Sequence, residues 1–127
     1  MIPKLTWTMT LILLVALAGC GGAPTPEQLA DRSLDVVRKQ ADELSVQELQ
    51  QQASLHRDAA RDLDRKIDEL RQQRRSLSFD ELTGEKAAQI DQSMKDLGEL
   101  TRRLRDRHGV FVDKLRQKGV STEEYKI

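Results

Sequence analysis

The chain has 127 residues with 21 basic and 21 acidic side chains, and only 3 % of its residues are aromatic. This balanced charge gives no electrostatic reason to bind nucleic acid, because phosphate backbones select strongly basic surfaces. Alanine, leucine, glutamate, glutamine, lysine and arginine predominate, and no alternation of β-branched residues follows the first twenty positions. The composition therefore predicts a single all-α domain built from long helices.

Residues 1–19 have the organisation of an export signal. Lys4 supplies a positive charge, an apolar stretch runs from Leu5 to Ala18, and small residues precede a cleavage point. The stretch is too short to cross a bilayer as a helix, which takes about 20 apolar residues. We therefore expect residues 1–19 to be a signal peptide.

The tetrad Leu17-Ala18-Gly19-Cys20 ends this stretch and contains the only cysteine of the chain. It resembles the lipobox of bacterial lipoprotein precursors, in which an aliphatic residue and two small residues precede a lipid-modified cysteine. The resemblance covers residues 1–20. It implies that Cys20 becomes the mature N-terminus and carries a diacylglycerol and an amide-linked acyl chain such as palmitate. Two or more acyl chains anchor a protein stably, whereas one binds only marginally.

The resemblance also implies a location in the cell envelope. Gly21 follows the cysteine, where many lipoproteins retained at the inner membrane of Gram-negative bacteria have Asp. In a host with two membranes we therefore expect a lipid-anchored protein on the periplasmic face of the outer membrane. Residues 20–25 form a short tether, whose four residues 21–24 reach at most about 14 Å. The folded part is thus expected close to the lipid surface.

Four capping-box patterns predict helix starts. In such a box a Ser or Thr accepts a backbone N–H, and a Glu or Gln follows three residues later. The boxes begin at Thr25, Ser45, Ser78 and Ser121. They divide the chain into an N-terminal helix over 26–44, two long helices within 45–118, and a C-terminal turn over 119–127.

Both long helices carry a seam of residues at alternating three- and four-residue spacing, which is typical of coiled coils. The first seam is Val46, Leu49, Ala53, His56, Ala60, Leu63, Ile67, Leu70, Arg74 and Leu77. The second is Ala87, Ile90, Met94, Leu97, Thr101, Leu104, His108, Phe111, Leu115 and Lys118. We therefore predict an antiparallel coiled-coil helical hairpin over 45–118, with arms about 48 Å long.

The N-terminal helix has its own apolar stripe, which is out of phase with the first seam, so we expect a bend at Ser45. The stripe consists of Ala30, Leu34, Val37, Ala41 and Leu44. Residues beside the hairpin seams are positioned to receive it, namely Leu55, Ala59, Leu100 and Val112. The predicted fold is therefore an elongated three-helix arrangement.

Two registers of the hairpin, one heptad apart, fit the seams. A longer turn around Thr83-Gly84 makes His56 face His108, whereas a tighter turn, with Ser78 starting the second arm, separates the two histidines. Both registers stay open at this point. The same seams also allow self-association between chains.

His56 and His108 are the only histidines, and both lie on a seam. A facing pair would bind a metal ion or respond to pH, since imidazole titrates near neutrality. A closed zinc site needs more ligands, and neither a free cysteine nor a third ligand is evident. We therefore interpret the histidines as polar layers that specify register, and we assign no metal or cofactor site.

The remaining motifs give no catalytic residue. Two basic clusters have acidic residues interleaved, so we interpret them as solvated helix faces and not as sites for anionic lipid headgroups. They contain Arg71, Arg74 and Arg75, and Arg102, Arg103, Arg105 and Arg107. No phosphate-binding loop, nucleophile elbow or thiol–histidine pair occurs, so we do not expect an enzyme.

These features predict a membrane-anchored envelope lipoprotein that acts as a non-enzymatic scaffold or adaptor. Its expected partners are the lipid bilayer, through Cys20, and an envelope protein that contacts polar helix faces or Val110–Ile127. The alternative is a module that binds an envelope ligand, either peptidoglycan or a metal ion at His56 and His108. The terminal Tyr-Lys resembles that of murein lipoproteins, which are linked to peptidoglycan through a C-terminal lysine. Here Lys126 is penultimate, which argues against such a link.

Overall fold

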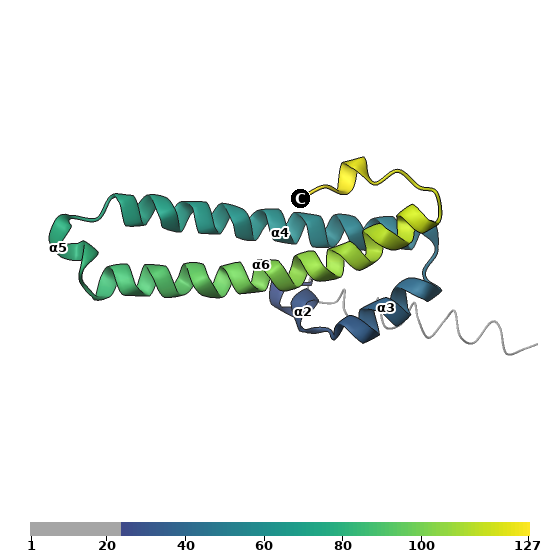
Figure 1. Ribbon diagram of the computed structural model, residues 1–127, viewed down its shortest axis with the longest axis horizontal. Coiled ribbons are helices and arrows are strands. Elements are labelled where there is room, and N and C mark those ends of the chain that lie inside the picture. Colours follow the sequence, from purple (N-terminus) through teal and green to yellow (C-terminus); the bar gives the residue numbers. More distant parts are fainter. Residues whose placement is uncertain (1–23) are drawn as a thin grey trace, which may run out of the picture.

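The computed structural model describes residues 24–127, and every regular element in that range is helical (Figure 1). In chain order these are α2 (Pro26–Asp31), α3 (Leu34–Glu43), α4 (Val46–Arg75), α5 (Phe79–Leu82), α6 (Glu85–Gln117) and the 3-10 helix η1 (Glu123–Tyr125). The all-α class predicted from the sequence is confirmed. The signal peptide, the lipobox and most of the tether lie outside the described residues.

The long helices α4 and α6 lie side by side and run in opposite directions, with α5 at the turn between them (Figure 1). They have 30 and 33 residues, which makes them about 45 and 50 Å long. Two ion pairs join them, Arg74 with Asp91 at 2.7 Å and Arg105 with Asp64 at 2.9 Å. Because exposed ion pairs add little stability, these contacts mark the alignment of the helices and are not the main force between them.

The turn between α4 and α6 uses two local signals. Ser78 accepts the N–H of Glu81 through its hydroxyl, and the Glu81 carboxylate accepts the N–H of Ser78, which completes a capping box at α5. Gly84 then adopts an extended backbone and precedes α6. The second long helix therefore begins at Glu85 and not directly after Ser78.

The N-terminal segment forms two short helices where a single helix over 26–44 was predicted. Ser33 caps α3 because its hydroxyl accepts the N–H of Val36, which would otherwise bond to the carbonyl of Arg32. That carbonyl instead accepts a hydrogen bond from Nε of Arg107 on α6, at 2.8 Å. The break therefore has two causes, a local cap and a contact from a distant helix.

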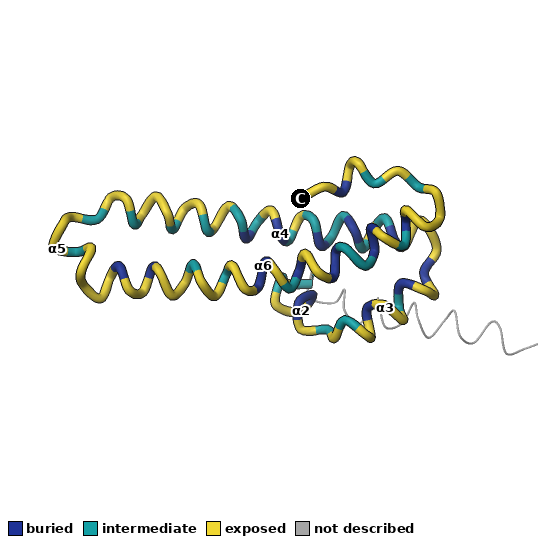
Figure 2. Tube along the Cα trace, viewed as in Figure 1, coloured by how far each residue is buried: buried dark blue, intermediate teal, exposed yellow. Residues whose placement is uncertain are grey.

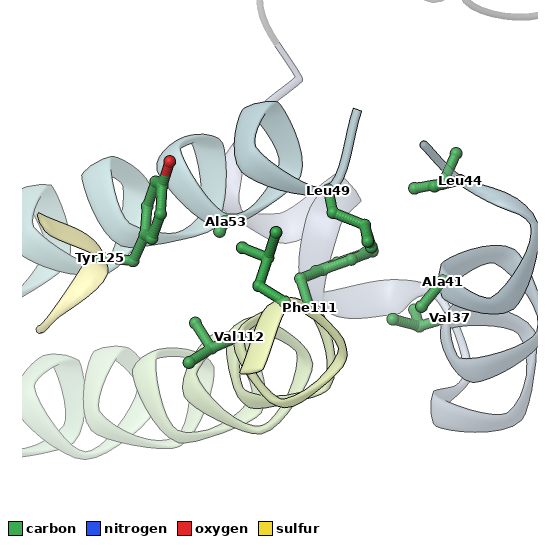
Figure 3. Packing of buried hydrophobic residues seen from close by; sticks show 9 residues of the cluster. Val37, Ala41, Leu44, Leu49, Ala53, Phe111, Val112 and Tyr125 are labelled. Atoms are coloured by element: carbon green, nitrogen blue, oxygen red, sulfur yellow. The ribbon is translucent and has the colours of Figure 1, made fainter. Parts of the chain in front are cut away.

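Two clusters of buried hydrophobic residues form the core, in the part of α4 and α6 against which α2 and α3 lie (Figure 2). The first cluster contains Val37, Ala41, Leu44, Leu49, Ala53, Phe111, Val112, Leu115 and Tyr125. The second contains Leu29, Ala30, Leu63, Leu100 and Leu104, with Leu55, Ala59 and Leu97 packed against it. Figure 3 shows Phe111 together with Leu49 of α4 and Val37 of α3, so three helices share the first cluster.

The half of α4 and α6 nearest α5 is thinner. Ala87 and Ile90 are buried there, but most of its seam residues are only half-buried, namely Ile67, Leu70, Leu77, Met94 and Leu97. In this half α4 and α6 pack against each other, whereas α2, α3 and the C-terminal segment add to the core in the other part of the molecule. Most of the hydrophobic stabilisation therefore comes from the half that α2 and α3 cover.

The C-terminal segment turns back along α4 after a glycine. Gly119 has φ 76°, and the N–H groups of Gly119 and Val120 bond to the carbonyls of Arg116 and Leu115, which is a Schellman motif. The capping box predicted at Ser121 is wrong, because the following 3-10 helix starts after Thr122 and has no side-chain cap. Tyr125, the last residue of this helix, is buried in the first cluster.

Candidate functional site

Cys20, the one site residue predicted from sequence, lies outside the described residues. The first described helix after it is α2, which begins at Pro26, six residues later. Leu29 and Ala30 of α2 pack against Leu63 and Leu100, which lie near the midpoints of α4 and α6. A group bound at Cys20 would thus be connected to the middle of the long helices. Within residues 24–127, no helix has both the length and the apolar character needed to cross a bilayer.

The two histidines lie on the facing helices, where His56 is 0 % exposed and His108 is nearly as buried. The ring of His56 packs against Phe111, with centroids 5.0 Å apart. Its Nδ1 lies 2.7 Å from the carbonyl oxygen of Gln52. Since a carbonyl only accepts, Nδ1 carries the proton and Nε2 has the lone pair. The Nε2 atoms of both histidines are buried and have no hydrogen-bond partner in the described part of the chain.

The surroundings of the histidines favour their neutral form. Burial lowers the pKa of His56 to about 4, and the positive charges of Arg32 and Arg107 add to this shift, while the bond to Gln52 opposes it. Burial likewise lowers the pKa of His108, against a hydrogen bond to the backbone of Tyr125. Both imidazoles are therefore neutral at pH 7.

Two arginines accompany the histidines at this level. Arg107 is only 8 % exposed and donates to the carbonyls of Arg32 and Arg103, at 2.8 and 2.9 Å. Arg32, between α2 and α3, donates to Oε1 of Gln40 at 2.6 Å. Burial lowers the pKa of both guanidinium groups, which nevertheless remain charged at neutral pH. We call the set Arg32, Gln52, His56, Arg107 and His108 the polar layer.

The polar layer corrects one sequence interpretation. Arg107 was assigned to a solvated basic face, but it is buried under the break between α2 and α3. Its burial could have been predicted from its position, since Arg107 follows Leu100 by one heptad and therefore lies on the stripe that receives the N-terminal segment. No sequence pattern predicted the position of Arg32. Within residues 24–127, no group of three or more His, Cys, Asp or Glu side chains is arranged to hold a metal ion.

The α5 end of the molecule has a different character. Phe79 is 84 % exposed and Leu82 is 40 % exposed. Leu82 lines a shallow hollow of about 250 Å³ together with Arg71, Arg74 and Arg75. Arg71 pairs with Asp68 and Arg74 pairs with Asp91, each at 2.7 Å. We call Phe79, Leu82 and these three arginines the tip.

The C-terminal segment is held by intramolecular contacts. Arg57 and Arg61 of α4 donate to the carbonyls of Glu124 and Lys126, at 2.6 and 2.8 Å. The ammonium group of Lys126 pairs with Glu123 at 2.7 Å on the surface. Much of the segment that the sequence offered as a contact surface is therefore engaged with α4.

Comparisons with protein-family models, with curated proteins and with solved structures give no match for this chain.

Proposed function

We propose that the chain is a lipoprotein anchored in the bacterial envelope through acylated Cys20, and that it acts as a non-enzymatic scaffold that presents its tip to a partner protein. The anchor rests on the lipobox Leu17-Ala18-Gly19-Cys20. In a host with two membranes, the periplasmic face of the outer membrane is the proposed site. The partner is a protein of the same envelope.

The proposed scaffold is an antiparallel coiled-coil hairpin with the N-terminal helices docked on it. The ion pairs Arg74–Asp91 and Arg105–Asp64 support the register with the longer turn, since both join positions that this register brings close. The same register places His56 and His108 at one level. Seams of this kind fill the space between two helices with side chains and leave little concave volume for a substrate.

The anchor point affects how the scaffold is presented. Pro26 follows Cys20 by six positions, so an extended tether spans about 20 Å at most. The start of α2 lies near the middle of the long helices, and each end of the hairpin is about 25 Å from this point. The hairpin is thus held at its middle, and the tip extends away from the attachment point.

Exposure of Phe79 is the observation that carries the tip proposal. A phenylalanine that is 84 % exposed forgoes the free energy of burying a large apolar side chain. It is held in place by a capped helical turn, so its position is defined. Aromatic and arginine side chains are enriched where protein surfaces bind each other, and the tip contains both, since Phe79 begins the short helix whose last residue, Leu82, lines a hollow with three arginines.

A cross-linking pull-down of the lipidated protein from membranes tests this function. The matched variants are Phe79→Ala at the tip and Val36→Ala on α3, because Val36 is also an exposed apolar residue, at 55 %. We expect Phe79→Ala to reduce recovery of a reproducible partner at least tenfold and Val36→Ala to leave it unchanged. Equal recovery with both variants would remove the tip as the contact site. Sedimentation with purified peptidoglycan in the absence of a protein partner would favour the ligand-binding alternative.

A further inference from the structure

Four residues of the polar layer lie, along the chain, between buried residues of the two hydrophobic clusters, namely Arg32, His56, Arg107 and His108. On α4, His56 lies between Ala53 of the first cluster and Leu63 of the second. On α6, Arg107 and His108 lie between Leu104 and Phe111, and Arg32 lies between the clustered residues of α2 and α3. The layer therefore coincides with the break between the two short helices.

We propose that the polar layer is an acid-sensitive switch: protonation of His56 releases α2 and α3 from α4 and α6, which remain paired. This inference does not depend on the lipid anchor or on the tip. It assigns to the buried histidine a conformational role that its place on the seam did not predict.

Arg32 and Arg107 place positive charges near His56, and the neutral ring of His108 also faces it. Arg32 approaches from the linker between α2 and α3, and Arg107 and His108 approach from α6, whereas Gln52 on α4 contributes a neutral carbonyl. No carboxylate is among the groups that act on His56 in the described chain. A proton on Nε2 would thus place a third full charge beside two buried guanidinium groups, where charges are weakly screened.

Two carboxylates act on Arg107 of the polar layer and are not among the groups that act on His56. Asp31 and Asp106 raise the pKa of Arg107, and the side chain of Asp31 is mostly exposed, 3.5 Å from Arg103. On the other side, His108 faces Arg57 and the backbone of Tyr125. Protonation of His108 therefore acts mainly on the C-terminal segment, while protonation of His56 acts on the linker.

The N-terminal helices are the part most easily released. With 6 and 10 residues, α2 and α3 are shorter than the roughly 12–15 residues at which isolated helices become stable in water. One polar contact that holds them, from Arg107 to the Arg32 carbonyl, lies in the same layer. Release of α2 and α3 removes Arg32 from the polar layer, which relieves its repulsion of protonated His56. It also admits water to His56, which restores solvation of the charged imidazole.

The sign and size of the effect follow from linkage. In the docked state the pKa of His56 is about 4, and in the released state it returns towards its ordinary value of 6.5. The released state binds more protons between these values, so docking weakens as the pH falls from 6.5 to 4 and is unaffected above pH 7. Between pH 7.5 and pH 5 the docking equilibrium should weaken about 30-fold, given these two pKa values.

Hydrogen exchange of the full chain at pH 7.5 and pH 5, corrected for the intrinsic exchange rates, tests the switch. We expect protection of residues 26–43 to fall about 30-fold at pH 5, with little change in the middle of α4 and α6. His56→Gln should abolish this fall, because glutamine does not titrate. His108→Gln is the matched control, which should retain the fall in residues 26–43.

A second measurement covers the case in which His56→Gln does not fold. NMR titration of the unmodified protein follows the two histidine rings, and the His56 ring should titrate over the same pH range in which residues 26–43 lose protection. Protonation of His56 with residues 26–43 still protected would overturn the proposal. So would an unchanged acid response in His56→Gln, or a simultaneous loss of protection in α4 and α6.

Discussion

Phe111 and Phe79 occupy opposite environments, although both are phenylalanines on helices. Phe111 is the largest side chain that is fully buried in residues 24–127, and it packs between α3 and α4 and against the ring of His56. Phe79 is almost fully exposed at the tip. The first is therefore expected to contribute to stability and the second to contribute to binding.

Substitution of the two phenylalanines by alanine should separate these roles. Phe111→Ala leaves a cavity among tightly packed residues and should lower the free energy of unfolding by about 3–5 kcal/mol. Phe79→Ala removes a side chain that is already in water, so the change should stay within about 0.5 kcal/mol. Urea unfolding followed by circular dichroism measures both. A loss of several kcal/mol in Phe79→Ala would show that the tip is packed and not presented to solvent.

At the level of single residues, sequence predicted burial well where α2 and α3 cover the long helices, both on the seams and at Leu100 and Val112 beside them, and less well near α5, where most seam residues are only half-buried. The buried seam histidine His56 was expected, since its position follows from heptad spacing. Arg107 was not, because its burial depends on the linker that crosses it and on the carbonyl of Arg32 that it binds. A contact between residues so far apart in the sequence cannot be predicted from the residues next to Arg107.

The helical elements begin where the sequence supplies a cap. Thr25, Ser45 and Ser78 each accept a backbone N–H three residues later, as predicted. Ser33 caps a helix in the same way, but no Glu or Gln stands three residues after it, so the capping-box pattern missed it. The division into α2 and α3 therefore depends on the Ser33 cap together with the tertiary contact from Arg107 to the carbonyl of Arg32.

Ser33→Ala tests whether this cap maintains the break. Loss of the hydroxyl leaves the N–H of Val36 without its partner, and we expect stability to fall by about 1 kcal/mol. Ser93→Ala on the exposed face of α6 is the control and should not destabilise the protein, since alanine favours helix interiors. Thermal melting gives the stabilities. An increase in helix content and stability in Ser33→Ala would indicate that α2 and α3 fuse, contrary to the assignment of the break to Ser33.

For the whole molecule, the sequence predicted an all-helical chain, and the structure confirms this class. The start of the C-terminal turn was predicted less well, because Ser121 matches a capping box whereas the 3-10 helix follows Thr122 and has no side-chain cap. Burial is also uneven along the length, because the two clusters lie from the middle of the long helices to the end opposite the exposed tip (Figure 2). We therefore propose that stability and partner binding depend on different parts of one elongated molecule.

Attachment at the middle of this scaffold depends entirely on Cys20, so lipidation is the central claim. Intact-mass and peptide mass spectrometry of the membrane-extracted protein, beside a Cys20→Ala variant, tests it most directly. We predict a mature chain that begins at Cys20 and carries diacylglycerol and an amide-linked acyl chain, and we predict that Cys20→Ala is unlipidated and leaves the membrane fraction on washing. An unmodified Cys20 in the wild-type protein, or a Cys20→Ala variant that remains firmly in the membrane, would contradict this account.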